Sequence, residues 1–309
     1  MTNIAATQSL AGLNVGPIPS HSRGTACING RFLPAAEATV SIFDHSFLYG
    51  DGAFESIACR RGRLFMLEPH VARLWASCQY LKIEIPLVRE RVTALALETI
   101  ARNEMANGDL RIVVSRGDGY PMSDPSRTQN PLVIFSVQEK PISHYPAEKG
   151  LSLIVAATRR TPSICLDPRV KSNNYLNHIM AKLEAVAAGA DDAIMLDTNG
   201  HLAELAGCNI FVVSKGRLST PKVGNGLEGI TRATVLELAE AHDFAVVSEV
   251  FTEDLTTYDL YTADEVFVTG TGTGVAFARE VDGRVIGTGV CGPVAKAVGV
   301  AYEKLLDGD

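Results

Sequence analysis

The sequence of 309 residues lacks the features by which several classes of protein are recognised. No apolar stretch reaches the roughly 18 residues that a membrane-spanning helix needs, and no charged segment precedes the first apolar residues, as it would in a signal peptide. The net charge is -7, and no basic run offers a footprint for nucleic acid. We therefore expect a cytoplasmic protein whose partners include neither nucleic acid nor a membrane.

The six cysteines form no CxxC pair, and no histidines accompany them at metal-ligand spacing. This scatter predicts reduced thiols and no metal site. Each cysteine is expected to be a small buried hydrophobic side chain. The sequence also shows no internal repeat and no low-complexity segment.

The composition, with 46% hydrophobic and 20% charged residues, is typical of a globular protein, and the length favours two domains. Strand runs joined by hairpin turns such as Asn29-Gly30, together with separate helices, predict an α+β fold and not a doubly wound sheet. Residues 1–25 show little periodicity and are expected to form an N-terminal extension. The rest divides into a small α+β domain over 26–140, a linker over 141–149 and a larger α+β domain over 150–309.

Two charged residues in the second half are candidates for catalysis. Lys171 follows a strand and a loop, directly precedes a helix, and is followed by SNNYLN without another charge. A desolvated lysine there would have a lowered pKa, so that its neutral amine could condense with an aldehyde; a solvated surface lysine is the alternative. Glu204 lies in the strand HLAELAG, where it would either hold a pyridine nitrogen protonated or point outward to solvent.

Two segments have the character of phosphate-binding cradles. Residues 227–231 open a helix, whose free N–H groups and positive dipole end attract an anion. Residues 269–274 end a strand and offer hydroxyl groups and close backbone approach. No βαβ unit follows this GTGTG run, so a dinucleotide fold is not favoured. Arg73 lies on an amphipathic helix, from which it would reach a phosphate or lie along the surface.

Together these residues resemble the class IV aminotransferases, fold type IV pyridoxal-phosphate enzymes that include branched-chain and D-amino acid aminotransferases and aminodeoxychorismate lyase. The likeness runs from about Ile28 to the C-terminus and is closest to the branched-chain enzymes. It rests on five segments in one order: FDHSFLYGDGAFESI, LEPHVARLWAS, VKSNNYLNHIMAKLEAVAAGADDAIMLD, LEGITRATVLELA and YTADEVFVTGTGTGVAFAREVDGRVIG. The resemblance implies two α+β domains with pyridoxal 5'-phosphate in the cleft between them, and a homodimer with the site near its interface.

The resemblance also implies roles for individual residues. Lys171 would carry the cofactor as a Schiff base and act as the catalytic residue, and Glu204 would face the ring nitrogen. The cofactor would be bound by Arg73, Lys171, Tyr175, Glu204, Cys208, Asn209, Leu227, Gly229, Ile230, Thr231, Gly270 and Thr271. The substrate would be bound by Tyr49, Phe54, Ser56, Asp109, Arg111, Gly272 and Thr273.

The implied reaction moves an amino group from a small amino donor to a keto acid acceptor by a ping-pong mechanism. A branched-chain-like L-amino acid as donor and 2-oxoglutarate as acceptor are the first expectation. The chain departs from most branched-chain enzymes at Ser56, Ala58, Asp109, Cys208 and Gly274, in segments that shape the substrate pocket of the family. A D-amino acid or (R)-amine transaminase, an aminodeoxychorismate lyase and a non-catalytic phosphate-binding protein therefore stay open as alternatives.

Overall fold

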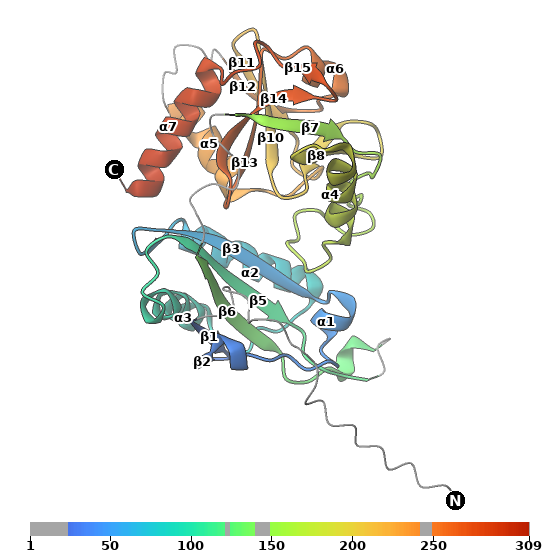
Figure 1. Cartoon of the computed structure of the whole chain (residues 1–309). Coiled ribbons are helices and arrows are strands. Elements are labelled where there is room, and N and C mark those ends of the chain that lie inside the picture. The colour runs from blue at the N-terminus through green and yellow to red at the C-terminus, as the bar shows by residue number, and fades with distance from the viewer. Residues whose placement is uncertain (1–23, 121–123, 140–148, 242–248, 309) are drawn as a thin grey trace, which may run out of the picture.

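The computed structural model describes residues 24–120, 124–139, 149–241 and 249–308. Two bodies of sheet and helix lie one above the other, the first built from the N-terminal half of the chain and the second from the C-terminal half (Figure 1). Their mixture of helices and sheets confirms the predicted α+β class. The predicted extension and linker lie almost wholly outside the described residues, so their boundaries stay predictions. We propose that each sheet, together with its helices, forms one domain.

The first sheet is antiparallel and has the strand order β2-β1-β6-β5-β3-β4. Its strands are β1 (Thr25–Ile28), β2 (Arg31–Pro34), β3 (Gly52–Arg60), β4 (Arg63–Leu64), β5 (Gly108–Ser115) and β6 (Leu132–Glu139). The predicted hairpin turn joins β1 to β2, and Asn29 and Gly30 both have the positive φ angles that this tight turn requires. Short 3-10 turns span Ala35–Glu37 and Pro125–Arg127.

Two helices cover this sheet, namely α2 (Leu67–Leu81) and α3 (Arg89–Arg102). The apolar residues of α2 recur at helical spacing, and Val71, Leu74 and Cys78 are buried. Leu74 and Cys78 pack in one core with apolar side chains of α3 and of the central strands. The apolar face of α2 predicted from the sequence is therefore the face that packs on the sheet. Arg73 lies on the same helix at the edge of that contact.

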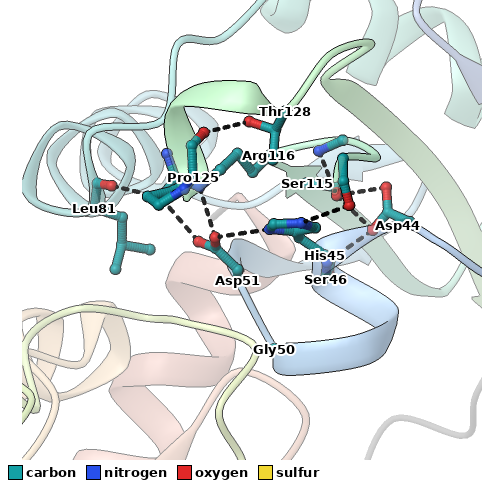
Figure 2. Close-up of polar contacts among 12 residues, drawn as sticks. Asp44, His45, Ser46, Gly50, Asp51, Leu81, Ser115, Arg116, Pro125 and Thr128 are labelled. Carbon is teal, nitrogen blue, oxygen red and sulfur yellow. Dashed lines mark hydrogen bonds and ion pairs between the residues drawn. The ribbon is translucent and has the colours of Figure 1, made fainter. Parts of the chain in front are cut away.

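A short helix, α1 (His45–Tyr49), connects β2 to β3 and is held by buried polar side chains (Figure 2). Asp44 caps the helix through two backbone N–H groups and accepts a 2.6 Å hydrogen bond from Ser115 of β5. Asp51 accepts two hydrogen bonds from Arg116, at 2.6 and 2.9 Å, and the same guanidinium donates to two carbonyls at the end of α2. These contacts fix α1 to β5 and α2.

The second sheet has nine strands in the order β12-β11-β10-β13-β14-β7-β8-β9, with β15 paired to β14. They are β7 (Leu151–Val155), β8 (Asp192–Leu196), β9 (Leu202–Leu205), β10 (Asn209–Ser214), β11 (Arg217–Pro221), β12 (Glu249–Glu253), β13 (Glu265–Gly270), β14 (Gly274–Val281) and β15 (Arg284–Val285). Three neighbouring pairs are parallel and the others antiparallel. This mixed pairing excludes the doubly wound alternative.

The helices of the second half are α4 (Leu176–Ala188), α5 (Ile230–Ala241), α6 (Thr257–Tyr261) and α7 (Pro293–Asp307). Apolar residues of α5 and α7 pack with β10, β11, β13 and β14 in one core, and α4 packs on β7 and β8 around small alanine side chains. No helix in the described part of the chain is long and apolar enough to cross a membrane.

All six cysteines are free thiols, as predicted. Four are buried, but the expectation of burial is wrong for Cys165 and Cys291, which are exposed. Both lie in loop segments, where no packed layer covers a small side chain.

Candidate active site

A cavity of about 320 Å³ lies between the two domains. Its wall comes from the loop before α4, the ends of β9 and β13, the loop before α5, and Arg73 of α2. All the residues predicted to bind the cofactor line it: Arg73, Lys171, Tyr175, Glu204, Cys208, Asn209, Leu227, Gly229, Ile230, Thr231, Gly270 and Thr271. Residues spread over most of the chain thus meet around one space of a size that suits a small organic ligand.

Lys171 is half-buried, and its amine lies at the cavity wall. Its Nζ is 3.4 Å from the hydroxyl of Tyr175 and 4.7 Å from the ring centre of Phe54. Within the described residues, no carboxylate lies within ion-pair distance of this amine. Its main chain is fastened to the first domain, because its N–H donates to Ser77 of α2 and its carbonyl accepts from Phe54 of β3. Lys171 is therefore not a solvated surface lysine, which was the alternative interpretation of the sequence.

Glu204 of β9 is buried, with 4% of its surface exposed, and its carboxylate reaches the cavity. One oxygen accepts a 2.6 Å hydrogen bond from Arg160, and the other accepts one of 2.9 Å from the N–H of Leu227. Burial by itself would raise the pKa of Glu204, but His178 and Arg160 outweigh it, so the pKa lies below its usual value. The carboxylate is therefore ionised at neutral pH and able to stabilise a protonated ring nitrogen.

The start of α5 forms an anion cradle at the cavity wall. Gly229, Ile230 and Thr231 present the first turn of this helix, where backbone N–H groups have no partner within the helix. The side chain of Asn209 donates to the carbonyl of Leu227 at 2.9 Å and holds the turn in place. A Cβ atom at Gly229 would overlap the Asn209 side-chain oxygen, so a larger residue here would displace the side chain that holds the turn. The cradle fits a phosphate group.

Arg73 adds a cation to this cradle. Its guanidinium donates to both carboxylate oxygens of Glu55, each at 2.7 Å, and to the carbonyl of Glu228 at 2.6 Å. His70 contributes a third hydrogen bond to Glu55, from Nδ1 at 2.7 Å. Glu55 has no exposed surface. Its burial would raise the pKa, but Arg73 and His70 overcome that effect and lower the pKa to about 2.

This low pKa predicts an acid dependence of stability. The pKa of Glu55 is about 2 in the folded chain against a usual 4.5, so its stabilising contribution is complete above about pH 4.5 and is lost as the pH falls toward about 2. The free energy of unfolding of the wild type, relative to that of Glu55→Gln, should fall by about 2 kcal/mol between about pH 6 and about pH 3. Urea unfolding of both cofactor-free proteins measures it. A pH-independent difference would contradict the pairing.

Two buried polar atoms in the cavity wall have no partner among the described residues, namely Nδ1 of His178 and Oγ1 of Thr269. Buried polar groups normally have a partner, so both suit a wall that faces a polar ligand. Nearby, burial raises the pKa of Cys208 to about 12, and its thiol lies 3.2 Å from the hydroxyl of Thr273. Cys208 is therefore a neutral thiol and not a nucleophile.

The residues predicted to bind the substrate are more widely spread. Two of them contact residues of the cavity wall: the ring of Phe54 packs edge-on against Tyr175 at 5.1 Å, and the hydroxyl of Thr273 lies 3.2 Å from the thiol of Cys208. The guanidinium of Arg111 lies over the Phe54 ring, 4.1 Å from its centre. Ser56 pairs with Arg111 across β3 and β5. Asp109 and Gly272 line a separate hollow of about 30 Å³. Tyr49 of α1 is exposed. The substrate roles of these residues stay predictions.

Several polar residues near the cavity were not predicted from the sequence, among them Glu55, His70, Arg160 and His178. Glu55 could have been predicted, because it is an acidic residue within the otherwise largely apolar strand GAFESIAC. His70 and Arg73 are spaced to lie on one face of α2, which was a second signal. Arg160 lies in a loop 44 residues before its partner Glu204, and nothing in its neighbourhood distinguishes it from a surface arginine.

An amine, a buried ionised carboxylate and an anion cradle around one cavity suit the aldehyde, the ring nitrogen and the phosphate of pyridoxal phosphate. This combination defines a class of enzyme that works on amino groups. The chain belongs to the family "Amino-transferase class IV", whose model matches residues 52–281. It is accordingly a pyridoxal-phosphate-dependent aminotransferase.

Similar proteins support this membership. The protein of Methanocaldococcus jannaschii with the name "Putative branched-chain-amino-acid aminotransferase" is 43% identical, over 91% of this chain and 94% of its own length. The branched-chain-amino-acid aminotransferase of Pseudomonas aeruginosa is 32% identical, over 92% of this chain and 94% of its own. Among solved structures, a T.th. branched-chain amino acid aminotransferase with pyridoxamine 5'-phosphate superposes with a TM-score of 0.87 at 33% identity, covering 93% of this chain and 95% of its own.

Proposed function

We propose that the chain transfers the amino group of branched-chain-like L-amino acids to 2-oxoglutarate by a ping-pong mechanism, with Lys171 holding the cofactor as a Schiff base. The observation that carries the proposal is the position of Lys171 Nζ at a cavity whose wall also contains ionised Glu204 and the α5 cradle. The similarity to branched-chain enzymes supports the donor.

Each residue has a defined part in this reaction. Bound pyridoxal phosphate supplies an electron sink for the bond that breaks at the α-carbon of the donor. Lys171 Nζ would act as the general base that takes the α-proton from the donor and as the general acid that gives it back later in the reaction. Glu204 would hold a proton at the ring nitrogen, and His178 and Arg160 keep that carboxylate ionised. Arg73 and the first turn of α5 bind the phosphate.

A donor panel with one fixed acceptor tests the substrate. L-leucine, L-isoleucine and L-valine are expected to support turnover with 2-oxoglutarate, while D-alanine and (R)-1-phenylethylamine are not. A preference for either of the last two would replace the proposed donor with a D-amino acid or an (R)-amine. Release of pyruvate from aminodeoxychorismate without any keto acid would instead indicate the lyase.

We also propose that the protein works as a homodimer. Along α4, large apolar side chains recur every three or four residues and are exposed, among them Leu176 at 69% and Leu183 at 54%. A second exposed group surrounds α1, with Phe43 at 65% and Phe47 at 70%. Surfaces of this kind are usual where a partner covers them. The two groups flank the segment of Lys171, which fits a dimer with its sites near the interface.

An Ile179→Asp/Leu183→Asp variant should therefore be monomeric. Two charges in the centre of the apolar face of α4 would have to be buried without a partner, which is strongly unfavourable. Sedimentation should give a mass near 33.0 kDa for the variant and about twice that for the wild type. Val300→Asp is the control, since Val300 is an exposed apolar residue on α7, outside both groups. A variant that sediments like the wild type would place the interface elsewhere.

A further inference from the structure

Arg73 is supported by a buried polar cluster that the proposed chemistry does not itself use. The cluster consists of Glu55 on β3 and His70 and Arg73 on α2. His70 and Arg73 are three positions apart, so both side chains project from one face of the helix toward the strand. Glu55 and His70 are almost completely buried, and the Arg73 side chain is 13% exposed.

The hydrogen bonds fix the plane of the Arg73 guanidinium. Nε and one terminal nitrogen meet the two oxygens of Glu55 side by side, and such a bidentate pair defines both distance and orientation. The other terminal nitrogen donates to the carbonyl of Glu228, directly before the cradle glycine Gly229. A guanidinium has five N–H groups, and these contacts use three of them. The other two have no partner among the described residues, and Arg73 lines the cavity.

The charges of the cluster also indicate that it acts by orienting Arg73. A carboxylate only accepts hydrogen bonds, so Nδ1 of His70 is the donor in their contact. Burial, more than any other influence, lowers the pKa of His70, so its ring is neutral at neutral pH. The cluster then holds one negative and one positive charge. The net charge of the cluster therefore attracts an anion only weakly. Arg73 would bind an anion mainly through the direction of its free N–H groups.

We propose that Glu55, supported by His70, is a positioning residue that aims the free N–H groups of Arg73 at the cofactor phosphate and ties the α5 cradle to the first domain. This inference rests on the proposed function, in which that phosphate lies at Arg73. Glu55 and His70 do not touch the phosphate themselves. They act through the orientation of Arg73.

Comparing pyridoxal phosphate with pyridoxal, which lacks the phosphate, isolates this role. The full-length protein, freed of cofactor, is titrated with each compound and followed by visible absorption. Glu55→Gln keeps the size of the side chain but turns one acceptor into a donor that faces Arg73. It should weaken pyridoxal phosphate binding about 10- to 100-fold, as loss of a hydrogen-bond partner behind a metal ligand does. Pyridoxal binding should change less than about twofold.

Two further comparisons show whether Glu55 acts through Arg73. In an Arg73→Met background, Glu55→Gln should cause no additional loss of pyridoxal phosphate affinity, because the residue that it positions is gone. His70→Leu removes the donor to Glu55 and should give a smaller loss, while His70→Asn, which offers a donor near the same place, should restore binding. The His70 pair decides the matter if Glu55→Gln fails to fold.

Several results would overturn the inference. An equal loss for both compounds would indicate general damage to packing, and unchanged or tighter pyridoxal phosphate binding would show that Glu55 only neutralises Arg73. If Glu55→Gln weakened pyridoxal phosphate binding as much in the Arg73→Met background as in the wild type, Glu55 would act independently of Arg73. A wild-type chain that binds pyridoxal but gains nothing from the phosphate would overturn the positioning role and leave the proposed reaction standing. A wild-type chain that binds neither compound would overturn both.

Discussion

Lys171→Ala should abolish turnover, lowering kcat by about 10⁴-fold or more, because the residue proposed to form the covalent link and to move the proton is lost. The visible absorption of the bound cofactor should change as well. Borohydride treatment should fix the cofactor on Lys171 in the wild type and leave the variant unlabelled, as read from peptide masses. Half-reactions with L-leucine, followed by absorption, measure the rate directly.

Two variants make this test specific. Lys171→Arg keeps a positive charge at the position but cannot condense with an aldehyde, so it should be as inactive as the alanine variant. Lys222→Ala removes an exposed lysine that pairs with Asp254 away from the cavity, and it should retain full activity. Turnover near the wild-type rate in Lys171→Ala would end the assignment of this lysine.

Glu204→Gln is expected to have the second-largest effect. The amide keeps the shape of the side chain but loses the charge proposed to hold the proton on the ring nitrogen, and Arg160 loses its ionic partner. Removing one such electrostatic group typically lowers kcat by about 10²- to 10³-fold. Single-turnover rates with L-leucine measure the loss separately from substrate binding.

Glu265→Gln is the matched control for this change. Glu265 is also a buried carboxylate on a strand, but it accepts hydrogen bonds from the first N–H groups of α7 and does not line the cavity. Its replacement should reduce stability through the lost helix cap and leave kcat unchanged. If both variants lost activity equally, the effect of Glu204→Gln would be one of folding and not of the ring nitrogen.

Much of the fold follows from local patterns. The turn at Asn29-Gly30 and the apolar stripe of α2 depend on residues close together in sequence, and both appear where the sequence predicts them. The residues of the cavity wall were predicted differently, because neither Lys171 nor Glu204 is distinctive by itself. Only the order of segments along the chain pointed to a shared site.

The residues that were missed have partners that sequence alone does not reveal. Glu55 and Arg73 are 18 positions apart and meet because α2 packs on β3 at one particular register. Arg160 meets Glu204 because the loop after β7 is hydrogen-bonded, through the N–H of Arg160, to the end of β8, which pairs with β9. Such pairings depend on the tertiary arrangement, which is also why the placement of Tyr49 and Asp109 relative to the cavity could not be read from their motifs.

The main-chain attachment of Lys171 has a consequence for how this enzyme fails under heat or denaturant. The amine of Lys171 lies at a cavity built mostly by the second domain, whereas the backbone of Lys171 is hydrogen-bonded to Phe54 and Ser77 of the first. Local opening of the first domain therefore withdraws the amine, although the core of the second domain stays packed. Inactivation is therefore expected to begin with the loss of this attachment, before the core of the second domain unfolds.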